Sequence, residues 1–253
     1  MDAARQSEPA ARQAALPVAE PAVEAHPLEP FLPFGAETLF LGSFPPPRQR
    51  WSMDFFYPNF TNDFWRIMGL LHFSNPHYFE LAPLQSVATL PSSHYPLPSL
   101  SVQSSPCGSE SRKRSAKGFD RERIIAFCER EGLAFFDTAV QVRRLKGNAS
   151  DAFLEVVEPT DVGALLERMP RCHRLATTGG KAAEELHAIL LRAIDSSSAP
   201  TAGPYELVAP PIGECVTVRA FGRDLEWWRM PSSSRAYPLP LARKAAQYAK
   251  LFK

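Results

Sequence analysis

The sequence has little of what marks membrane or exported proteins. Nowhere in its 253 residues does an apolar run approach the roughly 18 residues that a membrane-spanning helix needs. The N-terminal stretch, residues 1–30, has no basic start followed by an apolar run, which argues against a secretory leader. We therefore expect an intracellular protein with no membrane partner, cytoplasmic and nucleoid-associated if its source is bacterial.

Cysteine pairs and metal-binding motifs are also missing. The four cysteines lie far apart without a CxxC pair, and the six histidines show no HxH or HExxH spacing. This pattern favours buried, reduced thiols over a disulfide framework or a zinc or iron–sulfur site. The triphosphate-binding motif GxxxxGK[ST] and the serine-hydrolase motif GxSxG are absent as well. We expect neither a metal nor another cofactor.

The chain has no excess of one charge. Its 28 basic and 27 acidic residues give a net charge of +1, so no overall basic field points to a nucleic-acid partner. Two local basic segments could still contact a phosphate backbone, SRKRSAKG at 111–118 and RRLKGNASD at 143–151. Each can equally be an ordinary solvated loop, so charge alone leaves the partner open.

Proline is abundant, at 25 residues, and unevenly placed. Residues 1–35 are rich in Ala, Pro and Glu without sustained periodicity, which predicts a disordered N-terminal tail. Serine, proline and basic residues dominate 83–118, which indicates a low-complexity insertion in a surface loop. We therefore expect one domain over 36–253 that is interrupted at about 83–118.

Apolar runs and helical periodicity alternate along the rest of the chain. This alternation predicts a three-layer α/β/α domain with a mainly parallel sheet. Expected strands lie at 38–41, 133–138, 173–180, 214–221 and 225–234. Expected helices lie at 61–73, 120–131, 181–194 and 239–253, with two further short helices within 150–170.

Unusual loops follow the expected strands. They are Gly42–Pro47, Asp137–Thr138, Gly179–Gly180 and Pro231–Arg235. Because ligands of open α/β sheets bind beyond the carboxyl ends of the strands, we expect these loops to surround one site. Asp137 and Thr138 are expected at its floor.

The first of these loops, LGSFPPP, is followed by the aromatic segment MDFFYPNFTNDFW. Successive prolines fix the backbone and leave the loop little freedom, as the wall of a preformed pocket would require. Asn62 then stands where a side chain could point into a cleft. A rigid connector in front of an aromatic core, with Asn62 as a helix cap, explains the same residues.

The last loop, RMPSSSRAYPL, offers hydroxyls, backbone N–H groups and one cation. Ser232, Ser233, Ser234 and Arg235 could together grip a phosphate group. The segment TTGGKAAEEL, which contains Lys181, likewise suits an anion site between a strand and a helix. A solvated serine turn is the alternative interpretation.

Taken in order, LGSFPPP, FFYPNFTNDFW, TTGGKAA and WWRMPSSSRAYPL resemble the uracil-DNA glycosylase superfamily, and within it the mismatch-specific and hypoxanthine-DNA glycosylase-like branch. The resemblance covers residues 38–253 without 83–118. It implies a three-layer α/β/α sandwich around a four-stranded parallel sheet. It also implies a monofunctional, monomeric DNA glycosylase of base-excision repair that needs no metal. Such an enzyme flips a deaminated or mismatched base, of the uracil or hypoxanthine type, into a pocket and hydrolyses its N-glycosidic bond.

The resemblance also implies roles for individual residues. Asn62 would orient the attacking water, and Asp63, next along the chain, is a less favoured candidate for a catalytic base. The ring of Phe56 or Tyr57 would stack on the flipped base, and the proline loop would hold the departing base through backbone N–H groups. The substrate-binding set is Gly42, Ser43, Phe44, Pro45, Phe56, Tyr57 and Asn148, and the DNA-binding set is Ser232, Ser233, Ser234, Arg235 and Lys181.

Two residues depart from the superfamily pattern. Phe44 stands where the uracil enzymes carry an Asp or Asn, and Met230 stands where many carry a His or Asn. Both changes predict a slow enzyme or an altered substrate. They also leave open a catalytically weak or inactive DNA-binding protein that recognises damaged or single-stranded DNA. A hydrolase of free nucleosides is a third hypothesis.

Overall fold

The computed structural model describes residues 21–81, 117–146, 150–194 and 207–253. Residues 83–116 of the predicted insertion and residues 1–20 of the predicted tail lie outside these residues. Among the residues described, every helix is too short or too polar to cross a bilayer.

The core of the fold is a five-stranded sheet with the order β3-β2-β6-β8-β7. The strands are β2 (Thr38–Gly42), β3 (Leu133–Asp137), β6 (Arg174–Thr178), β7 (Glu214–Ala220) and β8 (Arg223–Met230). Four of them pair in parallel, whereas β7 runs antiparallel to β8 along the edge. The expected four-stranded parallel sheet is therefore wrong in its strand number. The turn at Phe221 and Gly222, both with positive φ, folds β7 back onto β8 as a hairpin.

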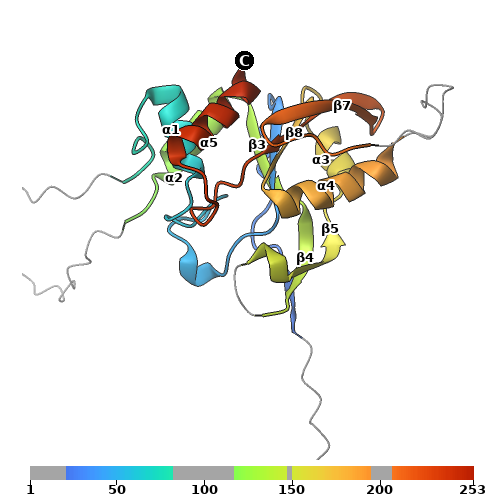
Figure 1. The fold of residues 1–253 in the computed structure, drawn as a ribbon, viewed down its shortest axis with the longest axis horizontal. Helices are drawn as coiled ribbons and strands as arrows, with labels where there is room; N and C mark the ends of the chain where they lie inside the picture. Colours follow the sequence, from blue (N-terminus) through green and yellow to red (C-terminus); the bar gives the residue numbers. More distant parts are fainter. Residues whose placement is uncertain (1–20, 82–116, 147–149, 195–206) are drawn as a thin grey trace, which may run out of the picture.

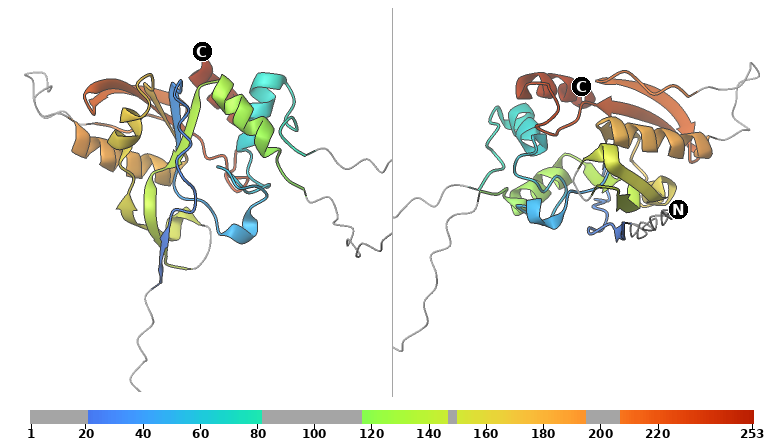
Figure 2. Two further views of the ribbon diagram at one scale, coloured as in Figure 1. Left: turned by 180° about the vertical axis from the view of Figure 1, so that it is seen from behind. Right: turned by 60° about the horizontal axis from the view of Figure 1, so that its bottom comes forward.

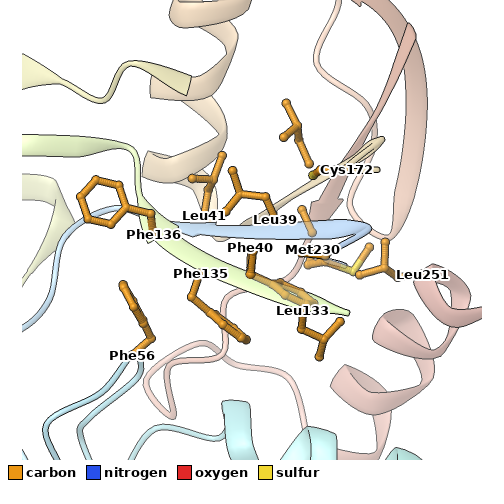
Figure 3. Packing of buried hydrophobic residues seen from close by; sticks show 14 of the residues in the cluster. Leu39, Phe40, Leu41, Phe56, Leu133, Phe135, Phe136, Cys172, Met230 and Leu251 are labelled. Atoms are coloured by element: carbon orange, nitrogen blue, oxygen red, sulfur yellow. The ribbon is translucent and has the colours of Figure 1, made fainter. Parts of the chain in front are cut away.

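Helices cover both faces of this sheet (Figures 1 and 2). On one side lie α1 (Phe64–Phe73), α2 (Arg121–Arg130) and α5 (Leu241–Tyr248), and on the other α3 (Val162–Glu167) and α4 (Gly180–Ala193). Every residue of β2 and β3 is buried, as expected for strands covered on both faces. Figure 3 shows Leu39 and Leu41 on one face of β2 and Phe40 beside Phe135 on the other.

A second, antiparallel sheet with the order β1-β4-β5 lies next to the first. It consists of β1 (Val23–Ala25), β4 (Ala139–Arg144) and β5 (Leu154–Pro159). The sequence pattern predicted a helix where β5 lies. Only a single 3-10 turn, Asp151–Phe153, precedes the strand, because the backbone of 154–159 pairs with β4. Two further 3-10 turns are Arg48–Arg50 and Ala249–Phe252.

The predicted disordered tail is too long. Residues 21–35 belong to the folded domain, since β1 pairs with β4 and Phe31 exchanges two backbone hydrogen bonds with Phe135. The tail composition hid this because β1 is only three residues long and fully exposed. Its stability comes from its partner strand rather than from its own apolar residues.

The described cysteines are all free thiols. Cys128 and Cys172 are buried as expected, and burial raises the pKa of the Cys172 thiol to about 11. Cys215 is exposed on β7, so the expectation of a buried thiol is wrong there. Cys107 lies outside the described residues.

Replacing Phe40 by Ala should destabilise the protein by about 3–5 kcal/mol, because the ring is fully buried and its loss leaves a cavity between two layers. Phe34→Ala is the matched control, since that ring is 79% exposed and should change stability by no more than about 0.5 kcal/mol. Chemical denaturation of both variants measures the difference. Equal losses would contradict the placement of Phe40 at the centre of the core.

Candidate functional site

A cavity of about 710 Å³ opens at the carboxyl edge of the central sheet. Its wall includes the last residues of three parallel strands, Gly42, Asp137 and Thr178, together with the loop that follows β8. This volume lies within the range of small-molecule sites. Ten predicted site residues line the cavity: Gly42, Ser43, Phe44, Pro45, Phe56, Tyr57, Asn62, Ser232, Ser233 and Ser234.

The proline loop is held in place by hydrogen bonds from two side chains. Arg144 donates to the Pro45 carbonyl at 2.7 Å, and the Trp51 indole donates to the Pro46 carbonyl at 2.6 Å. A side chain at position 42 would meet Asp137 Oδ1, so a larger residue there would have to displace that carboxylate. The loop is therefore a fixed wall, in keeping with its proline content.

Phe44 lines the cavity but also belongs to a small apolar cluster. Its ring packs against Ala139, Val142 and Leu154 of the second sheet, and the Arg144 guanidinium lies 5.5 Å from the ring centre. Met230 is 1% exposed and lies in the core (Figure 3). Neither departure from the superfamily pattern introduces a polar side chain into the cavity.

Tyr57 is the ring best placed to receive a flat ligand. One of its faces stacks on Phe64, with the ring centres 3.9 Å apart and the planes 5° from parallel, and the residue lines the cavity. Its hydroxyl lies 2.8 Å from Thr178 Oγ1, and burial raises the pKa of that hydroxyl. Its positive φ of 52° is uncommon for a non-glycine residue. Phe56, by contrast, is only 4% exposed.

Asn62 combines the two roles that its sequence position suggested. Its Oδ1 accepts the Phe64 N–H at 2.8 Å, which stabilises the start of α1, and the residue also lines the cavity. The amide nitrogen is a remaining donor, and Oδ1 keeps a second lone pair. The arrangement fixes the amide while leaving it capable of contacting a ligand.

Asp63 does not line the cavity, and its contacts do not suit a general base. Its carboxylate accepts from Lys244 Nζ at 2.9 Å and from Arg235 at 3.3 Å. Lys244 is 1% exposed and also donates to the Ser234 carbonyl at 2.7 Å. The Asp63 N–H donates to the Ser233 carbonyl. Asp63 therefore joins α1, the serine loop and α5 into one unit.

The serine loop is ordered by its own hydrogen bonds. Ser232 and Ser234 hydroxyls accept from the backbone N–H groups of Ser234 and Ala236, and the Tyr248 hydroxyl donates to the Pro231 carbonyl. Arg235 reaches back to Asp63, although its side chain is 58% exposed. The loop thus presents hydroxyls at the cavity from a fixed backbone.

Two carboxylates border the cavity, and sequence reasoning assigned a role to neither. Asp137 was expected only at the floor, and Asp151 was missed because its segment was interpreted as a helix. Ser43 Oγ donates to Asp151 Oδ1 at 2.8 Å. Residue 151 as a whole is exposed, yet desolvation of the Asp151 carboxyl raises the pKa of this group. The hydrogen bond from Ser43 acts in the opposite direction but is the smaller effect.

The remaining predicted residues lie elsewhere. Lys181 pairs with Glu185 at 2.7 Å along α4 and does not line the cavity, and Thr138 is fully buried. Asn148 lies outside the described residues. In the part of the chain that is described, no three His, Cys, Asp or Glu side chains form a group that could hold a metal ion.

No protein-family model matches this chain, and no curated protein matches it. Among solved structures, it is similar to the solution NMR structure of a candidate uracil DNA glycosylase from Methanosarcina acetivorans. The two share 18% sequence identity with a TM-score of 0.48, over 90% of this chain and 96% of that one. A likeness at this level assigns neither a family nor an activity.

Removing one partner of the Asp63–Lys244 pair should cost about 3–5 kcal/mol of stability, because it leaves an uncompensated buried charge. Asp63→Asn therefore destabilises strongly, and adding Lys244→Met should recover part of the loss. Asp54→Asn is the control, since the Asp54–Arg48 pair is exposed and should contribute about 1 kcal/mol or less. Chemical denaturation separates the cases, and equal effects at positions 54 and 63 would refute a structural role for the pair.

Proposed function

We propose that this protein is a monofunctional DNA glycosylase that flips a deaminated or mismatched base of the uracil or hypoxanthine type and hydrolyses its N-glycosidic bond. The supporting observation is the convergence of the proline loop, the Tyr57 ring, the Asn62 amide and the serine loop on one cavity. These are the segments on which the resemblance to the uracil-DNA glycosylase superfamily rests. DNA carrying a damaged base is the proposed partner.

The base would enter between the proline loop and the free face of Tyr57. Flipping a nucleotide costs a few kcal/mol. A rigid slot with an aromatic face limits the additional cost, because little free energy is lost in ordering the protein. The backbone N–H groups of the proline loop would stabilise the negative charge of the departing base. The Asp137 carboxylate at the floor accepts hydrogen bonds, so it favours a base that presents a ring N–H, as uracil and hypoxanthine do.

Asn62 is the proposed water-orienting residue. Its Oδ1 is already held by the Phe64 N–H, so the amide is fixed before a substrate arrives. The serine loop would hold a phosphate next to the flipped nucleotide through hydroxyl and backbone groups. Arg235, tied to Asp63 yet largely exposed, would add a cation at the same edge.

A second candidate is a protein of the same shape that binds damaged or single-stranded DNA without cutting the glycosidic bond. The placement of Phe44 and Met230 favours it, since one packs into an apolar cluster and the other into the core. On this hypothesis the cavity would hold a flipped base without a group that activates water.

Excision assays on duplexes that carry uracil, hypoxanthine or xanthine, with abasic sites then cleaved by alkali, distinguish the two candidates. We expect the wild-type protein to release at least one of these bases, and Asn62→Ala to lower the rate by about 10²- to 10⁴-fold. Asn75→Ala is the matched control, because Asn75 makes the same kind of side-chain turn, to the His77 N–H, at an exposed site that does not line the cavity. That variant should retain full activity.

Thermal melting of both variants checks that α1 remains folded. Full activity of Asn62→Ala would refute the proposed role of this amide. Tight, salt-sensitive binding of a damaged duplex without strand breaks would favour the binding protein. Turnover of free nucleosides without salt-sensitive DNA affinity would favour the nucleoside hydrolase.

A further inference from the structure

The N-terminal segment before the first core strand reaches the cavity. The strand β1 pairs with β4 in the register Val23↔Arg143 to Ala25↔Gln141, and Glu24 accepts from Arg144 at 3.0 Å. In Figure 1 this blue segment runs beside β4. The pairing continues for one more residue, because the His26 N–H donates to the Val140 carbonyl at 2.8 Å.

His26 is then fixed in an aromatic environment. Its side chain is only 4% exposed and lies at 4.5 Å from the Phe136 ring and 5.3 Å from the Phe44 ring, measured between ring centres. Nδ1 lies 2.8 Å from the Leu28 carbonyl oxygen and accepts from the Leu28 N–H at 3.2 Å, and Leu28 itself lines the cavity. With Nδ1 as the acceptor, the proton of the neutral imidazole is on Nε2. The imidazole is therefore enclosed by aromatic rings and held through Nδ1.

The other ring nitrogen meets Asp137. Nε2 lies 3.1 Å from Asp137 Oδ2, across 111 positions of sequence. The second carboxylate oxygen, Oδ1, lies close to Gly42, and Asp137 lines the cavity. One oxygen of Asp137 is thus held by His26, and this contact sets the direction of the other. A buried carboxylate without such a partner would be costly and free to rotate.

We propose that His26 is a positioning residue, which acts through Asp137 to hold one carboxylate oxygen in a set direction at the base-binding cavity. This inference rests on the proposed function. It adds that the segment before β2 completes the site. His26 does not line the cavity itself. Its effect on activity should therefore disappear when Asp137 no longer carries a carboxylate.

A double-mutant cycle tests this dependence. His26→Phe keeps a ring among the neighbouring aromatics but removes the Nε2 donor, and should lower excision kcat/KM by about 10- to 100-fold, as small misplacements of positioned groups do. In an Asp137→Ala background, where no acceptor remains for position 26 to hold, the same change should alter the rate by no more than about twofold, within the error of additivity. His26→Gln, which offers an N–H at the position of Nε2, should restore most of the activity.

Equal losses from His26→Phe in both backgrounds would overturn the proposal, because they would indicate a general structural role. Melting temperatures of all variants provide the check on folding.

If the wild-type protein excises no base, the proposed function fails. The cycle is then repeated on the affinity for a duplex containing 2′-fluoro-deoxyuridine, which resists cleavage. Coupling between positions 26 and 137 in that affinity would support the positioning role of His26 in a protein that binds DNA without catalysis. No preference for the modified duplex, or no coupling, would overturn it.

Discussion

The buried ion pair between Asp63 and Lys244 is the contact on which the geometry of the cavity depends. It brings together residues 181 positions apart and joins the start of α1, the serine loop and α5. Buried ion pairs add little net stability, because the desolvation of two charges offsets their attraction. This pair instead fixes the position of the serine loop. The Asp63 backbone N–H and the Lys244 ammonium both hold carbonyls of the serine loop, so the loop cannot shift without breaking the pair.

The opposite wall of the cavity is fixed by different means. Prolines restrict the first loop, and Arg144 and Trp51 hold two of its carbonyls. Both walls are therefore set before a ligand binds, which limits the entropy lost on binding. Asn62 and Asp63 are neighbours in the chain with separate functions. One supplies an amide to the cavity, and the other anchors the second wall.

Local patterns predicted the elements that carry their own signal. The buried strands at 38–42 and 133–137 and the helices α1, α2, α4 and α5 follow from periodicity. The rule for parallel sheets predicted that strand-end loops gather at one site, and three of the four expected loops line the cavity, whereas Gly179–Gly180 does not. Features that depend on a distant partner were not predictable. The strand β1 is too short and exposed to be recognised without β4, and β5 looked helical without its ladder. Asp63 looked like a candidate base because nothing in its neighbourhood reveals Lys244. Likewise, no local pattern connects His26 with Asp137.

Phe44 and Met230 stand where the uracil-DNA glycosylase superfamily carries polar groups in the first and last loops. The charges at the cavity indicate how hydrolysis would proceed without those groups. Met230 cannot donate to a departing base anion, and the carboxylates of Asp137 and Asp151 disfavour negative charge near them. In the proposed hydrolysis, however, the sugar becomes positively charged, like the oxocarbenium ion of glycoside hydrolysis. Carboxylates beside the sugar would stabilise that charge. On the proposed function, the cavity would therefore suit the sugar better than the departing base. Such a site would work best on bases that leave readily and would rely on the backbone N–H groups of the proline loop for the remainder.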